Sequence, residues 1–140
     1  RAVLASLARK NIVGIFPEGR ISRDGLLQRF QPGIAMVAAV SGAPVVPVGI
    51  LGAFDVLPRT RRWPRRGTIE MRVGDPIVFP DFPVEAGALS RRRLVEVLDA
   101  ILLGVCRAAG QEERFDLLRS RRATGRGNFE TLETVPGAAR

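Results

Sequence analysis

Residues 11–20 read NIVGIFPEGR, and this stretch decides the fold that the sequence predicts. Its apolar, β-branched run up to Phe16 is typical of an inner strand that is covered on both faces of a sheet. Pro17 ends the run, because proline has no backbone N–H to donate to a neighbouring strand. We therefore expect a buried strand over residues 11–16, which delivers the polar loop 18–31 to the edge of a sheet.

Helical and strand patterns alternate on both sides of this stretch. The expected elements are helices over residues 2–9, 33–41 and 91–109, and strands over residues 11–16, 45–50 and 68–73. Pro32 suits the first turn of the second helix, and Gly42 suits its end. Pro47 argues for an edge position or a bulge in its strand. This order of elements favours an α/β fold in which helices pack on a mixed or mostly parallel sheet.

The clearest predicted helix follows Ser90, a residue that commonly caps helix N-termini. Its apolar residues recur every three or four positions and form one face, which we expect to bury against the sheet. That face contains Leu94, Val95, Val97, Leu98, Ile101, Leu102, Val105 and Cys106. Cys106 is the single cysteine, so it excludes an internal disulfide or a multi-cysteine metal site and is expected to be a buried structural thiol.

The chain divides into two predicted regions at Gly110, which closes that helix. We expect one domain over residues 1–110 and a polar tail over residues 111–140, with a short helix over 112–119 and disorder from residue 121. The chain opens at Arg1, within an apparent helix, so it is interpreted as a piece of a longer protein. No apolar run is long enough to span a bilayer.

The composition is basic and lacks histidine. The 140 residues carry 22 Lys and Arg against 14 Asp and Glu, a net charge of +8, and contain no histidine. Residues 1–66 hold 11 basic and three acidic groups, so the whole excess lies there. Such a basic face indicates an anionic partner, which could be a phosphorylated small molecule, a lipid headgroup or a nucleic acid. Any imidazole base must come from outside these residues.

The loop after Pro17 is the strongest candidate for a binding site, because ligands of open α/β sheets bind where strands end. Gly19 permits close backbone approach, and the planar guanidiniums of Arg20 and Arg23 suit phosphate oxygens. Glu18 can orient one of these arginines or accept a hydrogen bond from a substrate hydroxyl. A solvated connecting loop with a surface ion pair is the alternative.

Several ordered motifs resemble the glycerolipid acyltransferases, the group that includes the 1-acylglycerol-3-phosphate and lysophospholipid acyltransferases. Phe16-Pro17-Glu18-Gly19 followed by Ser22 resembles their third conserved block, and residues 46–50 resemble their fourth. Residues 31–35 and 41–45 are similar to the link between the two blocks, and residues 73–77 to the turn that follows. The resemblance covers about residues 4–109 and implies the C-terminal part of an incomplete acyltransferase-type domain.

The resemblance implies transfer of a fatty acyl group from acyl-CoA or acyl-carrier protein to the free hydroxyl of a lysophosphatidic acid or related lysophospholipid. In this family a histidine, followed by an aspartate five positions later, takes the hydroxyl proton. This chain has no such block, so no catalytic residue is assigned in it, and neither a metal nor a tightly bound cofactor is implied. By resemblance, the acceptor site contains Phe16, Pro17, Glu18, Gly19, Arg20, Ser22 and Arg23, and the acyl side contains Val46 and Pro47.

This sequence departs from the commonest form of the third block at one point. Threonine and arginine usually follow the glycine, whereas this chain has Arg20 and Ile21. The variant resembles acyltransferase domains that act on lysophospholipids such as 2-acylglycerophosphoethanolamine, which leaves the acceptor headgroup open.

A second basic cluster surrounds the single tryptophan. An indole among guanidiniums suits the headgroup layer of an anionic membrane and also nucleic-acid phosphates. A solvated loop with Trp63 folded onto the core is the alternative. Because the substrate class requires a lipid surface, we expect membrane contact and no nucleic acid, through Arg61, Arg62, Trp63, Arg65 and Arg66.

The sequence thus predicts an acyltransferase of phospholipid biosynthesis, associated with the cytoplasmic face of a membrane, for which this chain supplies the acceptor-phosphate site. The alternative is a noncatalytic basic module that binds anionic membrane or nucleic acid on the same scaffold.

Overall fold

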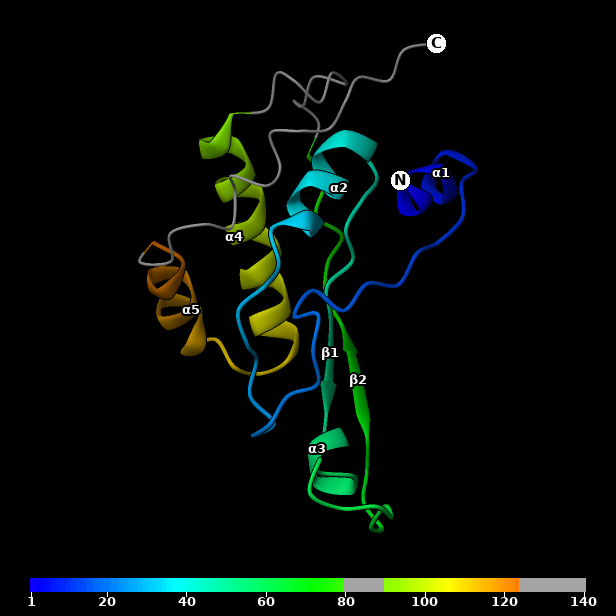
Figure 1. Cartoon of the computed structure of the whole chain (residues 1–140), viewed down its shortest axis with the longest axis vertical. Helices are drawn as coiled ribbons and strands as arrows, with labels where there is room; N and C mark the ends of the chain where they lie inside the picture. Colours follow the sequence, from blue (N-terminus) through cyan, green and yellow to red (C-terminus); the bar gives the residue numbers. More distant parts are fainter. Residues whose placement is uncertain (80–89, 124–140) are drawn as a thin grey trace.

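The computed structural model describes residues 1–79 and 90–123, which form helices and one small antiparallel sheet (Figure 1). The helices are α1 (Ala2–Ala8), α2 (Gly33–Ser41), α3 (Ala53–Val56), α4 (Arg91–Ala108) and α5 (Arg114–Ala123). The strands are β1 (Val48–Leu51) and β2 (Glu70–Val73). The predicted loop over residues 80–88 and most of the predicted disordered tail lie outside the described residues. The one-turn helix α3 was not predicted, whereas the short helix predicted over residues 112–119 is present as α5, shifted towards the C-terminus.

The core lies between α2 and α4, which pack side by side (Figure 1). Small residues of α2 and the apolar stripe of α4 interlock, because alanines let the two helices approach closely. The buried members are Phe30, Ala35, Ala38, Ala39, Leu94, Val97, Leu98, Ile101, Leu102, Cys106 and Leu118. The predicted burial of Cys106 is confirmed, and this burial raises the pKa of its thiol to about 11. The packing face of α4 is therefore directed mainly at a helix and also at β1.

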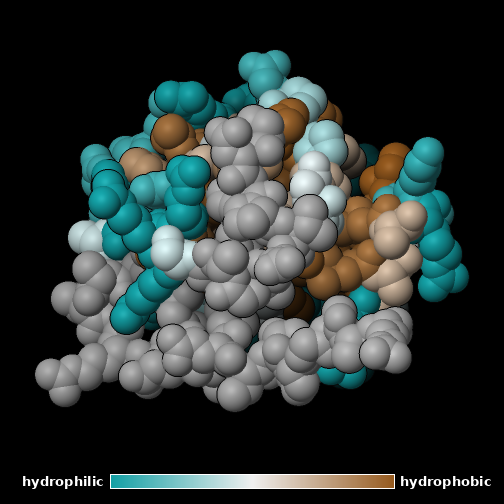
Figure 2. Space-filling model, turned by 90° about the horizontal axis from the view of Figure 1, so that it is seen from above, coloured by the Kyte–Doolittle hydropathy of each residue, from teal (hydrophilic) through white to brown (hydrophobic). Residues whose placement is uncertain are grey.

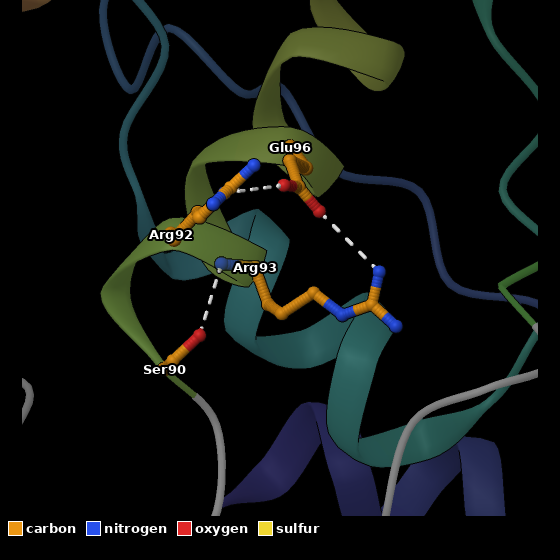
Figure 3. A network of polar contacts seen from close by, with 4 residues as sticks. All are labelled: Ser90, Arg92, Arg93 and Glu96. Carbon is orange, nitrogen blue, oxygen red and sulfur yellow. Dashed lines mark hydrogen bonds and ion pairs between the residues drawn. The ribbon is translucent and has the colours of Figure 1, made fainter.

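The predicted ends of α2 and α4 are confirmed by their caps. Gly42 follows α2 in the left-handed region at φ 61°, as expected for glycine after a helix. Ser90 caps α4, since its Oγ accepts a hydrogen bond from the backbone N–H of Arg93 (Figure 3). Arginines in the first turn of a helix oppose its dipole. Glu96 compensates by pairing with Arg92 at 3.2 Å and with Arg93 at 3.4 Å, as expected for a solvated face.

The sheet is a two-stranded antiparallel hairpin, so the prediction of a mixed or mostly parallel sheet is wrong for the described residues. Val48 pairs with Val73 and Ile50 with Met71. A parallel pair needs a crossover connection that returns the chain to the same end of the sheet. Here the chain between the strands contains only α3 and reverses at the far end of the hairpin (Figure 1). Helices and strands alternate from α2 to α4, but β1 and β2 are antiparallel because of this connection.

The predicted buried strand over residues 11–16 is also wrong. The segment is not paired in a sheet, and Ile12 is 100% and Phe16 80% exposed. Its apolar composition fits an inner strand, but no strand of residues 1–79 or 90–123 lies alongside it to bond its backbone. Lys10 makes the turn before this segment: it has φ 61°, and its N–H donates to Leu7 O at 2.8 Å.

One face of the hairpin packs on α4 and the other is open. Gly49 lies directly on the Ala108 carbonyl, where a Cβ would overlap it. All four residues of β2 are exposed, so both faces of this strand are open to solvent. Apolar surface is therefore open on the described part of the molecule, and Figure 2 shows such patches beside hydrophilic ones in the view from above. None of the described helices is long and apolar enough to cross a bilayer.

Candidate functional site

The candidate acceptor site begins with a tight turn over Phe16, Pro17, Glu18 and Gly19. The Gly19 N–H donates to Phe16 O at 3.1 Å, with proline second and glycine fourth as type I turns favour. Gly19 has φ 64°, which a side chain would strain. Pro17 O accepts from the Gln31 N–H at 2.8 Å, so both ends of the polar loop are joined. Residues 16–19 therefore form a turn, and the bond between Pro17 and Gln31 closes the loop that follows.

The carboxylate of Glu18 bonds to the backbone of this loop. Its Oε2 accepts the backbone N–H of Gln28 at 2.8 Å, and its other oxygen has no hydrogen bond from the described residues. Partial burial raises the pKa of the Glu18 carboxyl, while the hydrogen bond from Gln28 opposes this rise. One carboxylate oxygen thus fixes the loop, and the other remains available to a substrate hydroxyl.

Ser22 and Asp24 form a second group of hydrogen bonds within the loop. Asp24 Oδ1 accepts from the Ser22 hydroxyl at 3.2 Å, the Leu26 N–H at 3.1 Å and the Gln28 side chain at 3.1 Å. The hydrogen bond from the Leu26 N–H, and to a lesser extent the one from the Ser22 hydroxyl, lower the pKa of Asp24. The predicted site residue Ser22 is therefore engaged inside the loop, where it also donates to Leu26 O at 3.1 Å.

Two residues beyond the predicted domain boundary at 110 form hydrogen bonds with the backbone of the loop. Gln111 Oε1 accepts the Leu27 N–H at 2.9 Å, and the Arg114 guanidinium donates twice to Leu27 O, at 3.1 and 3.0 Å. Sequence analysis missed both residues, because a contact between such distant positions leaves no local pattern. They connect the loop to α4 and α5.

Arg20 and Arg23 remain unpaired. Neither forms an ion pair with a carboxylate of the described residues, since Glu18 and Asp24 are held by the bonds above. Both arginines are exposed. The surface ion pair of the alternative interpretation is therefore absent among the described residues, and both guanidiniums are open to solvent.

The two residues expected on the acyl side point to different faces of the hairpin. Val46 is exposed. Four apolar residues of the hairpin are also exposed, as two cross-strand pairs: Val48 with Val73, and Ile50 with Met71. Pro47 is buried, and its ring fits between Gly74 and Gly104. The arrangement makes Val46 part of an open apolar surface, whereas Pro47 supports that surface from beneath.

The arginine-tryptophan loop, residues 57–67, is exposed except at Pro58. Trp63 is 80% exposed, so the alternative in which it folds onto the core is wrong. Two backbone bonds order the loop, from Arg61 N–H to Pro58 O at 2.9 Å and from Arg65 N–H to Val56 O at 2.7 Å. Its predicted contact residues Arg61, Arg62, Trp63, Arg65 and Arg66 therefore project from a defined turn. In the described parts of the chain, no three Cys, Asp or Glu side chains gather as a metal site would require.

Comparison with known proteins identifies the part of the chain that carries the candidate site. Residues 1–51 match a family model described as Acyltransferase. Over 46 residues the chain is 44% identical to chloroplastic 1-acyl-sn-glycerol-3-phosphate acyltransferases of Brassica napus and Arabidopsis thaliana. The aligned stretch covers 33% of this chain and 13% of each relative. No solved structure matches the chain.

Proposed function

Because residues 1–51 belong to the acyltransferase family, we propose that the protein transfers a fatty acyl group to the free hydroxyl of a lysophosphatidic acid or related lysophospholipid. The acyl donor is acyl-CoA or acyl-carrier protein, and no tightly bound cofactor takes part. The reaction serves phospholipid biosynthesis at the cytoplasmic face of a membrane. The observation that carries the proposal is the loop over residues 16–31, closed by its own hydrogen bonds, in which Arg20 and Arg23 form no ion pair with a described carboxylate.

The chemistry divides between this chain and residues outside it. A guanidinium binds a phosphate with two parallel charge-assisted hydrogen bonds, and a loop that is already rigid loses little entropy when it does so. Arg20 and Arg23 thus hold the acceptor phosphate, while the free oxygen of Glu18 accepts a hydrogen bond from the glycerol part. The proton of the attacking hydroxyl passes to a base outside these 140 residues, which contain no histidine.

The open apolar surface that includes Val46 serves the acyl chain in this proposal. An alkyl chain gains about 0.8 kcal/mol for each CH₂ that leaves water. Val46 precedes β1, in which Val48 pairs with Val73 and Ile50 with Met71 of β2, so exposed apolar side chains lie side by side across the hairpin. Arg61, Arg62, Trp63, Arg65 and Arg66 contact the anionic membrane from which the lipid substrate comes.

The proposal is tested with Arg20→Ala and Glu18→Ala in the full protein. Release of the donor thiol is followed with lysophosphatidate and, separately, with a monoacylglycerol that has no phosphate. We expect Arg20→Ala to raise KM for lysophosphatidate at least tenfold, as loss of a charged hydrogen bond implies. Use of the monoacylglycerol should be unaffected. Arg107→Ala, at the exposed last turn of α4, is the control for loss of one positive charge.

Two results would contradict the proposal. Wild-type kinetics in both variants would remove these residues from the acceptor site. A wild-type protein that binds anionic vesicles but releases no thiol from acyl-CoA or acyl-carrier protein would favour the noncatalytic basic module instead.

A further inference from the structure

A hollow of about 310 Å³ joins the two basic loops that sequence analysis treats as separate. Arg23, from the acceptor loop, lines it together with Arg59 and Thr60, from the arginine-tryptophan loop. The hollow lies open to solvent on the surface, so it can admit a polar headgroup. Arg20 is not among the lining residues, which separates this hollow from the part of the loop that carries Arg20.

The two sides of the hollow are held in place by packing that does not involve the arginines. Gly25, at φ 77°, lies against the Phe54 side chain of α3, and a Cβ there would come within 3.1 Å of the ring. On the other side, Pro58 is buried and its carbonyl accepts the Arg61 N–H, which closes the turn that carries Arg59 and Thr60. The contact between Gly25 and Phe54 thus brings the two loops together beside the hollow.

Charge makes the hollow attractive to an anion. Neither Arg23 nor Arg59 forms an ion pair with a described carboxylate, and Asp24, next in sequence to Arg23, is occupied by three hydrogen bonds within its own loop. Two guanidiniums at one hollow repel each other, and a bound dianion removes that repulsion. The Thr60 hydroxyl adds a neutral donor suited to the same oxygens.

We propose that this hollow binds the phosphate group of a phosphate ester, held by Arg23, Arg59 and Thr60. The site itself rests on the hollow and its charges. That the ester is a lipid rests on the proposed function, and two sources remain to be distinguished: the phosphate of the soluble acceptor headgroup, or that of an anionic lipid within a membrane.

Calorimetric titration of the full protein with glycerol 3-phosphate and with inorganic phosphate tests the site without any acyl transfer. Loss of a charged hydrogen bond should weaken glycerol 3-phosphate binding at least tenfold in Arg23→Ala and Arg59→Ala, and loss of a neutral one should weaken it a few-fold in Thr60→Ala. Arg107→Ala removes the same charge elsewhere and should bind as the wild type does. All four positions are exposed, so the variants should fold.

Trp63 provides the second arm, because it is the only tryptophan of these 140 residues and lies three residues after Thr60. Its emission is taken as the difference between the wild type and Trp63→Phe. Vesicles of phosphatidylcholine with and without phosphatidic acid are titrated while its emission is recorded. A blue shift that needs phosphatidic acid, Arg23 and Arg59, without measurable binding of glycerol 3-phosphate, assigns the site to membrane lipid. Binding of glycerol 3-phosphate in solution assigns it to the acceptor headgroup.

Two results would overturn the proposal. In the first, wild-type affinity for both probes persists in Arg23→Ala and Arg59→Ala. In the second, Arg107→Ala loses as much affinity as these variants, which would show a general effect of net charge. The thiol-release assay is scored separately, so a protein that binds phosphate at this hollow but transfers no acyl group would contradict the proposed function alone.

Discussion

The helical layer of α2 and α4 and the hairpin of β1 and β2 use similar apolar residues in opposite ways. Ile101 in α4 is 1% exposed, whereas Met71 in β2 is 68% exposed. The difference arises from what covers each element: α4 packs against α2, β1 and α5, whereas Met71 lies on a face of the hairpin that is open to solvent. Stability in this structure is therefore concentrated in the helices, and open apolar surface is concentrated where the chemistry is proposed.

The largest expected effect contrasts these two regions directly. Ile101→Ala removes a fully buried side chain and should lower the free energy of unfolding by about 2–5 kcal/mol. Met71→Ala should change it by less than about 0.5 kcal/mol, as is usual for surface positions. Denaturant titration of both variants provides the measurement. An equal loss in both would mean that Met71 is buried in solution and that the two regions do not differ.

Gly49→Ala tests a close contact between the hairpin and α4. The new methyl group would overlap the Ala108 carbonyl, and overpacking of this kind costs about 1–3 kcal/mol. Gly14→Ala is the matched control, because a Cβ at Gly14 meets nothing within 4 Å. If thermal unfolding showed the same midpoint for both variants, the hairpin would not be packed on α4.

The contrast also explains which elements could be predicted from sequence. Pro32, Gly42 and Ser90 act on their own neighbours, so the ends of α2 and the start of α4 follow from local chemistry. Residues 11–16 have the composition of a buried strand, but burial depends on a partner strand that local sequence does not specify. The prediction of a parallel sheet failed for the same reason, since strand direction depends on the path of the connection.

The candidate site likewise contains features that local sequence predicts and features that it does not. The sequence predicted a polar loop after Pro17 that presents Arg20 and Arg23, but not the turn over residues 16–19. The residues that fasten the loop, Gln111 and Arg114, act on Leu27 from a distant part of the sequence. The hollow at Arg23 and Arg59 likewise arises from a contact between Gly25 and Phe54, which no spacing within either loop reveals.

A smaller effect is expected at the start of α4. Ser90→Ala removes the hydrogen bond to the Arg93 N–H, and loss of such a cap costs about 1 kcal/mol. Ser90→Asn retains an acceptor and should restore most of the stability. Because α4 belongs to the helical layer, the loss should appear in global unfolding measured by circular dichroism. A Ser90→Ala variant as stable as Ser90→Asn would show that this cap does not contribute.

The smallest effect concerns pH and compares one glutamate from the acceptor loop with one from the hairpin. Burial raises the pKa of Glu18 above its ordinary value of 4.5, so the folded state holds this proton more tightly than the unfolded state. Its contribution to stability is present below pH 4.5 and is lost as the pH rises through the folded pKa. Glu70 behaves oppositely, because its hydrogen bond from Arg72 lowers its pKa, and its contribution is lost as the pH falls.

Two variants measured from pH 3 to pH 7, a range of about 4 units around these values, separate the two glutamates. Glu18→Gln keeps an acceptor for the Gln28 N–H but cannot ionise, so its stability relative to the wild type should increase with rising pH. The relative stability of Glu70→Gln should decrease over the same range. Parallel pH profiles for the two variants would show that Glu18 is as well solvated as Glu70, and the acceptor loop would then lack the partial burial that distinguishes it from the hairpin.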